Sequence, residues 1–114
     1  DTHGHLAGDD VLRELSKRVQ AIVGADEVFS RFGGEEFAIV AEWAPHEARE
    51  WAEQCRHLVA VEPFITCAGP LEVTISLGVA SPPPELLNRP QDLLSAADER
   101  LYDAKRSGRN RVGH

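Results

Sequence analysis

The chain contains only two cysteines, and their spacing excludes the common cysteine-based sites. Cys55 and Cys67 are twelve positions apart, without the CxxC pattern of a redox or zinc site or the density of a secreted disulfide scaffold. We therefore expect two reduced thiols. The sequence also lacks an apolar run of the roughly 18 to 20 residues that span a membrane, and it opens on no signal peptide. These absences predict a soluble, cytoplasmic domain without membrane contact of its own, and they leave open a membrane attachment elsewhere in a longer parent protein.

Positive charge is scarce as well. Twelve Lys and Arg residues stand against nineteen Asp and Glu, giving a net charge of −7. This balance argues against non-specific binding to nucleic acid, which depends on many basic contacts to phosphates. An anionic ligand would need a local basic patch, and residues 105–111 hold four of the twelve basic residues. The same cations could instead complement the negative end of a helix.

The remaining pattern predicts three amphipathic helices in one small domain of 114 residues. The first is expected over residues 8–23, capped by Asp9 or Asp10, after a polar, glycine-rich loop at residues 1–9. Pro45 is expected in the first turn of the second helix, which ends before Pro63. The third is expected from Pro90, with Gly108 as its C-terminal cap.

Strands are expected between these helices. Their ranges are 27–32, 36–41, 64–67, 72–80 and, at the end of the chain, 111–113. Consecutive strands with short turns imply antiparallel pairing, and amphipathic helices need a sheet face to cover. The sequence therefore predicts an α+β domain, an antiparallel sheet flanked by helices.

The most informative motif is the run RFGGEEF at residues 31–37. Gly33 and Gly34 favour a tight hairpin turn, because glycine enters positive φ at little steric cost. The backbone of such a turn can approach a phosphate closely, and the adjacent carboxylates of Glu35 and Glu36 can hold a hard cation such as Mg²⁺. The alternative is an ordinary solvated hairpin tip with surface acids.

With this motif, four segments resemble the GGDEF-domain diguanylate cyclases. They are THGHLAGDDVL at residues 2–12, RFGGEEFAIV at 31–40, VTISLGV at 73–79 and AADERLYDAKRSGRNRV at 96–112. They cover essentially the whole chain in the family's order. The resemblance implies an enzyme with the nucleotide-cyclase or polymerase-palm (ferredoxin-like) fold, which condenses two GTP into cyclic di-GMP and pyrophosphate. It also implies a head-to-tail homodimer, in which two copies of the domain each bind one GTP.

The resemblance also assigns the acidic residues and the glycines of the site. Glu35 matches the signature metal ligand, with Mg²⁺ as the expected ion and Mn²⁺ as an alternative, and Glu36 matches a second acid that assists the metal or the attacking hydroxyl. Both are therefore assigned as catalytic and metal-binding. Gly33 and Gly34 would let backbone amides lie against the phosphates. Asp9 matches the acid that accepts hydrogen bonds from the guanine edge.

Two basic residues complete the site implied by the resemblance. Lys105 and Arg109 match the cations that bind the triphosphate, and a separation of one helical turn would place them on one helix face. Arg106 lies off that face and is expected to point into solvent. His3 and His5 could in principle bind a transition metal with Asp1 and Asp9, but the family pattern favours a structural role for His5.

The chain departs from the family pattern in two places. The family has, before the position of Asp1, a strand and helix that carry a metal-binding Asp, a phosphate-contacting Lys and a guanine-reading Asn. We therefore expect the 114-residue chain alone to be inactive and a longer parent to be competent. Residues 24–27 read GADE where many members carry the product-docking motif RxxD, so product inhibition through that site is not expected.

Two other functions remain open at this point. The chain could be a non-catalytic module that binds GTP or relays dimerisation in a signalling protein. It could also be a purely structural interaction domain in which the polar motifs are accidental. A comparison of the wild type with Glu35→Ala separates these from an enzyme, because only an enzyme would lose synthesis while it keeps GTP binding.

Overall fold

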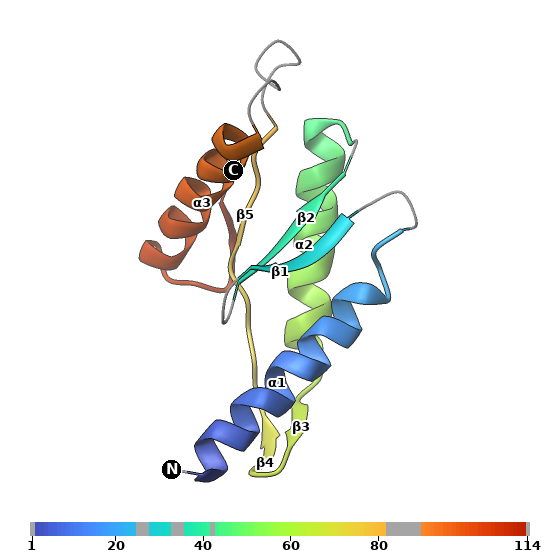
Figure 1. Cartoon of the computed structure of the whole chain (residues 1–114), viewed down its shortest axis with the longest axis vertical. Coiled ribbons are helices and arrows are strands. Elements are labelled where there is room, and N and C mark those ends of the chain that lie inside the picture. Colours follow the sequence, from blue (N-terminus) through green and yellow to red (C-terminus); the bar gives the residue numbers. More distant parts are fainter. Residues whose placement is uncertain (1, 25–27, 33–35, 42, 82–89, 114) are drawn as a thin grey trace. The chain divides into compact units, whose positions relative to one another are not determined.

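The computed structural model describes residues 2–24, 28–32, 36–41, 43–81 and 90–113 (Figure 1). The chain divides into two compact units, and each is described by itself. The first unit comprises Asp1–Glu42 and Leu58–Val73, and the second comprises Trp43–His57 and Thr74–His114. Helices and short strands alternate along both units, in the order α1, β1, β2, α2, β3, β4, β5, α3 and β6. This α+β architecture agrees with the fold class that the sequence predicts.

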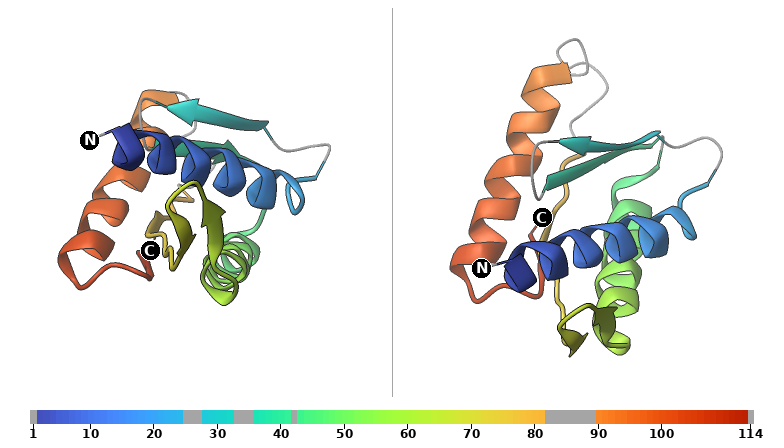
Figure 2. Two further views of the ribbon diagram at one scale, coloured as in Figure 1. Left: turned by 90° about the horizontal axis from the view of Figure 1, so that it is seen from below. Right: turned by 60° about the horizontal axis from the view of Figure 1, so that its bottom comes forward.

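The first unit is built on helix α1 (Thr2–Gln20). Ala7, Leu15 and Val19 are spaced by multiples of four, so they share one face of α1, and all three are buried. The antiparallel hairpin of β3 (Phe64–Thr66) and β4 (Gly69–Leu71) lies against the helix, as Figure 2 shows. Phe64 is fully buried, and β3 alternates buried and exposed positions along its length.

The second unit contains a parallel strand pair joined through a helix. Strand β5 (Leu77–Gly78) pairs with β6 (Val112–Gly113), and α3 (Pro90–Arg106) lies between them in sequence and packs on both strands (Figure 1). A Cβ atom built on Gly78 would overlap the backbone of Ala97 and Leu101. One on Gly113 would overlap Arg100 O, so both strands meet the helix backbone closely.

Helix α2 (Pro45–Val61) begins as the proline signal predicts. Pro45 is its first residue, and the Glu47 side chain accepts a hydrogen bond at 3.0 Å from the backbone amide of Ala44, just before the helix. This is half of a capping box, which satisfies one of the backbone donors left open at a helix N-terminus. Ala52, Cys55 and Val59 form its buried stripe. Most of the helix belongs to the second unit and its last turn to the first.

Two elements differ from the sequence prediction. Residues 2–8 are not a loop, because α1 starts at Thr2, and Asp9 and Asp10 therefore lie inside the helix and do not cap it. Ala7 extends the buried stripe of Leu15 and Val19, and the packing of this whole stripe offsets the cost of Gly4 and Gly8, about 1 kcal/mol each. The strand expected over residues 72–80 is also wrong in extent, because only Leu77–Gly78 is a strand and the partner of β3 is Gly69–Leu71.

The strands form three separate pairs among the residues that the structure describes. Two pairs are antiparallel, β1 with β2 and β3 with β4, and the third is the parallel pair of β5 and β6. Antiparallel pairing is thus confirmed for the strands that short turns connect. The parallel pair follows from the helix between its strands, since a crossover returns the chain in the same direction. None of the described helices has the length and apolar character of a transmembrane segment.

Candidate functional site

The hairpin of β1 (Val28–Phe32) and β2 (Glu36–Val40) carries the glycine and carboxylate motif. Its antiparallel register runs from Val28 with Val40 to Phe32 with Glu36, which agrees with the two strands that the sequence predicts on either side of the glycine pair. Gly33, Gly34 and Glu35 lie outside the described residues, and for Glu36 the structure describes only the backbone. The structure therefore fixes the strands that lead into the motif.

Two aromatic rings stiffen this hairpin. Phe29 and Phe37 lie diagonally on the same face, because the register pairs Arg31 with Phe37 and Phe29 with Ile39. Their ring centroids are 5.4 Å apart and the ring planes meet at 17°, which is a stacked arrangement. This pair orients the two strands that precede and follow the turn.

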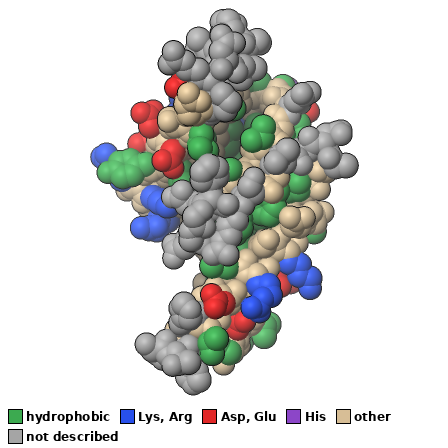
Figure 3. All heavy atoms as spheres, in the orientation of Figure 1, with side chains coloured by type: hydrophobic (Ala, Val, Ile, Leu, Met, Phe, Trp, Pro, Cys, Tyr) green, Lys and Arg blue, Asp and Glu red, His purple; other side chains and the backbone are tan. Residues whose placement is uncertain are grey.

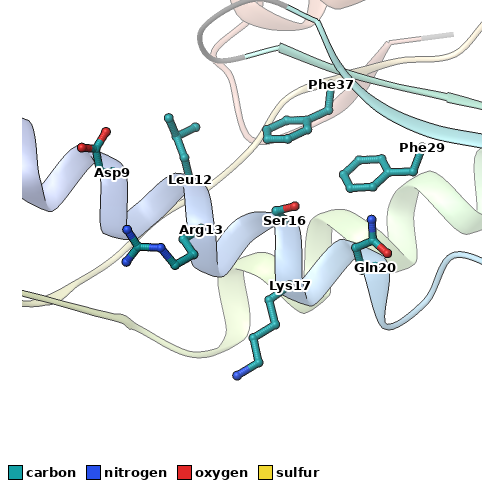
Figure 4. Close-up of a pocket in the computed structure, with 8 residues that line it drawn as sticks. All are labelled: Asp9, Leu12, Arg13, Ser16, Lys17, Gln20, Phe29 and Phe37. Carbon is teal, nitrogen blue, oxygen red and sulfur yellow. The ribbon is translucent and has the colours of Figure 1, made fainter.

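An open hollow of about 650 Å³ lies between α1 and this hairpin (Figure 4). Its lining combines an apolar wall with polar groups from α1, and the residues are Asp9, Leu12, Arg13, Ser16, Lys17, Gln20, Phe29 and Phe37. Figure 4 shows the two phenyl rings extending from the strands toward the helix, and the Lys17 side chain pointing away from the rings. Such a hollow suits a flat ring with polar edges, because the rings offer stacking area and the helix offers hydrogen-bonding groups.

The neighbouring carboxylates of Asp9 and Asp10 have different surroundings. Asp10 accepts a hydrogen bond from the backbone amide of Cys67 at 2.8 Å and one from Arg13 Nη1 at 3.2 Å. It therefore ties α1 to the turn between β3 and β4. Asp9 is exposed and lines the hollow. Asp9 therefore lies where the predicted base-recognition acid would meet a ligand, and its role there stays a prediction.

Charged side chains of both signs alternate along α1. Figure 3 shows Lys and Arg beside Asp and Glu on the face of this helix that the view presents. Arg13 pairs with Asp10 at 3.2 Å, and Arg18 pairs with Glu14 at 3.1 Å. Each of these two cations therefore has an acidic partner on the same helix.

The predicted triphosphate cations lie at the C-terminal end of α3, in the second unit. Lys105 is in the last turn of the helix, and Arg109 follows the helix end at Arg106. The prediction that both share one helix face is therefore wrong. Gly108 explains the difference, because its φ of +126° ends the helix and turns the chain before Arg109. Both cations are exposed, as is Arg106, whose guanidinium lies 5.6 Å from the ring centroid of Tyr102.

The helix end is closed by backbone hydrogen bonds. Ser107 N donates to Asp103 O at 2.9 Å, and Arg109 N donates to Ala104 O at 3.0 Å. These bonds satisfy two of the last carbonyls of α3. Gly108 thus acts as the predicted C-terminal cap, and Lys105 and Arg106 stand at the negative end of the helix dipole.

The histidines contribute no metal site to the described structure. Residues 2–8 are helical, so the proposed loop role of His5 is wrong, and the side chains of His3 and His5 lie outside the description. Across the described ranges, no three His, Cys, Asp or Glu side chains gather in a position to hold a metal ion. His46 and His57 are exposed.

The two cysteines are free, and their environments differ. Cys55 is buried, and burial raises the pKa of its thiol from 9.0 to about 11 because the thiolate would lose its hydration. Cys67 is exposed. A nucleophilic thiol needs an accessible site that favours the thiolate, so Cys55 is unsuited to catalysis.

Comparison with known proteins identifies a single family. The family model described as "Diguanylate cyclase, GGDEF domain" matches residues 1–111. The chain is 44% identical over 115 residues to the response regulator PleD of Caulobacter vibrioides, and the match covers 98% of this chain and 25% of that protein. It is 35% identical over 113 residues to diguanylate cyclase A of Treponema denticola, covering 98% of this chain and 30% of that protein. The chain thus spans between a quarter and a third of the length of these relatives.

Solved structures give the same result. The GGDEF domain of DgcB from Caulobacter crescentus, solved in complex with c-di-GMP, is 31% identical, with a TM-score of 0.89 over 99% of this chain and 65% of that one. The active GGEEF domain of a diguanylate cyclase from Vibrio cholerae is also 31% identical, with a TM-score of 0.77 over 94% of this chain and 67% of that one. These sequence identities and TM-scores show that the chain shares the fold of these domains as well as their sequence motif.

Proposed function

The chain belongs to the GGDEF family of diguanylate cyclase domains, and from this premise we propose that it condenses two GTP molecules into cyclic di-GMP and pyrophosphate. The observation that carries the proposal is the hollow between α1 and the β1–β2 hairpin. It joins an acid, Asp9, to stacked aromatic rings on the strands of the hairpin that bears the GGEEF sequence. Base recognition and phosphate chemistry are thus proposed on neighbouring parts of one unit.

The guanine base of GTP is proposed to occupy the hollow. Leu12, Phe29 and Phe37 supply the apolar area on which a purine packs. The carboxylate of Asp9 accepts from the N1 and N2 donors of guanine, whereas adenine presents an unprotonated N1 and no 2-amino group. Asp9 thereby gives selectivity for GTP. When adenine is bound instead, the carboxylate gives up hydrogen bonds to water and receives none from the base, which costs binding free energy.

The chemical step is a phosphoryl transfer. The 3′-hydroxyl oxygen of one GTP forms a bond to the α-phosphorus of the other, the bond from that phosphorus to the bridging oxygen breaks, and pyrophosphate leaves with the electron pair. The hydroxyl proton goes to a base or to water. A second transfer in the reverse sense closes the ring. Acceleration of such a step comes mainly from positioning and charge stabilisation.

The carboxylates of Glu35 and Glu36 are proposed to hold the divalent cation. Carboxylate oxygens are the hard ligands that Mg²⁺ prefers, so the donor chemistry of the motif fits this ion, with Mn²⁺ as the alternative. The ion, when bound, supplies positive charge to the phosphate oxygens during the transfer. The backbone amides of Gly33 and Gly34 are proposed to lie against the phosphates, where the absence of a Cβ permits close approach.

Lys105 and Arg109 are proposed to bind the triphosphate. Both cations are exposed at the end of α3. Lysine offers a compact charge and arginine a planar fork for two phosphate oxygens.

A second copy of the domain is the proposed catalytic partner. Each GTP must offer its hydroxyl to the other molecule's α-phosphorus, so two nucleotide sites have to face each other with opposite polarity. A head-to-tail homodimer satisfies this requirement with one GTP per domain. Because GTP is an intracellular metabolite, the reaction is proposed to take place in the cytoplasm.

The base-recognition part is tested with GTP and ITP, because inosine lacks only the 2-amino group of guanosine. In the protein that carries this chain, we expect Asp9→Asn to lower kcat/KM for GTP by about 10- to 100-fold, and for ITP by less. Glu50→Gln, on an exposed position of α2, is the matched control and should leave both values unchanged. An unchanged preference for GTP over ITP in Asp9→Asn would remove Asp9 from base recognition.

A further inference from the structure

The chain leaves α3 through a turn of three consecutive left-handed residues. The φ angles are +126° at Gly108, +62° at Arg109 and +48° at Asn110. Glycine adopts such angles freely and asparagine tolerates them, but for arginine the conformation is unfavourable. A turn of this kind persists only where surrounding contacts hold it.

The backbone on both sides of Arg109 is held by hydrogen bonds. Arg109 N donates to Ala104 O at 3.0 Å, and Arg109 O accepts from the Arg111 Nε at 3.1 Å. Directly after the turn, Arg111 O accepts from Leu77 N at 3.1 Å, where β6 begins to pair with β5. The turn is therefore anchored to the end of α3 and to the start of the parallel strand pair.

A side chain from α2 holds the middle of the same turn. Arg56 Nη1 donates to Asn110 Oδ1 at 3.0 Å, although the two residues are 54 positions apart in the chain. The guanidinium of Arg56 is itself fixed by Glu53, with Nη2 to Oε2 at 3.0 Å and Nε to Oε1 at 3.2 Å. The Arg56 side chain is 25% exposed. A carboxylate thus orients the guanidinium, and the guanidinium in turn holds the left-handed asparagine.

We propose that Arg56 is a positioning residue for Arg109. Through Asn110 it holds the turn at residues 108–110, so that the exposed Arg109 guanidinium is presented in a fixed place to a triphosphate. The anionic ligand in this inference rests on the proposed function. Bidentate binding of phosphate by arginine depends on the orientation of the guanidinium. If the turn were not held, the affinity for triphosphate would fall even with Arg109 present. This preorganisation raises the affinity, because the entropy of ordering the turn is lost on folding and not on ligand binding.

The test uses two variants that break the contact from opposite sides, Arg56→Gln and Asn110→Gly. Glycine keeps the left-handed backbone and removes only the acceptor. Arg49→Gln is the matched control, because it makes the same change of charge on an exposed position of the same helix. Calorimetry with inorganic tripolyphosphate measures the cation site without the base, and synthesis assays on the protein that carries this chain give KM and kcat for GTP.

We expect both variants to weaken tripolyphosphate binding about tenfold and to raise the KM for GTP by a similar factor, with kcat within about twofold of the wild type. Arg49→Gln should change neither. In an Arg109→Ala background, Arg56→Gln should cause no further loss, because its effect acts through Arg109. The inference would be overturned if Arg56→Gln weakened tripolyphosphate binding further in the Arg109→Ala background. It would also be overturned if Arg56→Gln and Asn110→Gly bound tripolyphosphate as well as Arg49→Gln does, or if the wild type did not bind it.

Hydrogen exchange separates positioning from general stability. The amide of Arg109 should lose at least about tenfold of its protection in Arg56→Gln, while the amide of Val79, bonded to Gly113 O at 2.8 Å, keeps its protection. Equal losses at both amides would mean that Arg56 merely stabilises the unit. Tripolyphosphate binding that depends on Arg56 without cyclic di-GMP formation would reject the proposed function alone. Cyclic di-GMP formation with a KM indifferent to Arg56→Gln would reject this inference alone.

Discussion

Arg18 and Phe64 are in cation–π contact, with the guanidinium carbon of Arg18 4.0 Å from the centroid of the phenyl ring. The same guanidinium donates to three carbonyl oxygens at the end of α2, those of Val59 at 3.2 Å, Glu62 at 3.0 Å and Pro63 at 3.1 Å. One arginine of α1 therefore closes the C-terminus of another helix and covers the ring of β3. Val59 lies in the last turn of α2, where carbonyls lack acceptor bonds inside the helix, and Glu62 and Pro63 follow the helix end, so Arg18 satisfies backbone carbonyls that the helix itself leaves open.

Replacing Arg18 should destabilise the domain. We expect Arg18→Ala to lower the free energy of unfolding by about 3 kcal/mol, since it removes charge-assisted hydrogen bonds and the cation–π contact together. Arg18→Lys should recover only part of this loss, because an ammonium lacks the planar fork. Urea denaturation measures both. Arg13→Ala is the control and should cost less than about 1 kcal/mol, since the Arg13 side chain is 76% exposed in its pair with Asp10. Equal losses for Arg18 and Arg13 would contradict this assignment.

Two glycines set how closely α3 lies on its strands. An added methyl group at Gly78 or Gly113 meets the backbone of α3, so Gly78→Ala and Gly113→Ala should each lower the free energy of unfolding by about 1 to 3 kcal/mol. Gly8→Ala gives the matched control inside α1, because no atom lies within 4 Å of the added Cβ. It should stabilise the domain by about 0.5 to 1 kcal/mol through helix propensity. A neutral Gly78→Ala would refute the close packing of β5 on α3.

The Cys55 thiol should make stability depend on alkaline pH. Its pKa is raised by burial to about 11 in the folded state, above the value of 9.0 for an exposed thiol, so the folded protein favours the neutral form. This contribution is fully present below pH 9 and is lost as the pH rises toward 11, with an effect of about 3 kcal/mol. The measurement is the free energy of unfolding from pH 8 to 11, in the wild type and in Cys55→Ala. An equally steep loss in both proteins would exclude Cys55 as its source.

Thiol titration at pH 8 gives an independent check on the same residue. One thiol, that of Cys67, should react in the native protein, and a second should react after denaturation. Two thiols that react at equal rates in the native state would show that Cys55 is accessible.

The sequence predicted those elements whose ends are set by local chemistry. Pro45 begins α2 and Gly108 ends α3, because proline and glycine restrict or permit backbone angles without help from distant residues. The start of α1 was missed, since Gly4 and Gly8 suggest a loop and the burial of Ala7 depends on tertiary packing. The hairpin around the GGEEF sequence was predicted from alternating strand residues and a glycine pair.

The residues of the candidate site remain predictions from the sequence, and the structure adds geometry that the sequence could not supply. The resemblance assigns Asp9 to the base, and the structure shows that its neighbour Asp10 accepts a hydrogen bond from Cys67 N. No local pattern could reveal a contact between positions 57 residues apart. The same holds for the contact between Arg56 and Asn110, 54 positions apart. The turn that carries Arg109 off the face of Lys105 is local, and it follows from the cap at Gly108.

Cyclic di-GMP formed from GTP and Mg²⁺ by the protein that carries this chain measures most directly whether GTP condensation depends on Glu35. The wild type should form cyclic di-GMP and release two pyrophosphates per product. Glu35→Gln should lose synthesis by at least about 10³-fold while binding GTP within about tenfold of the wild type, since it removes a metal ligand and leaves the base site intact. Synthesis unaffected by Glu35→Gln, or GTP binding without synthesis in the wild type, would contradict the account.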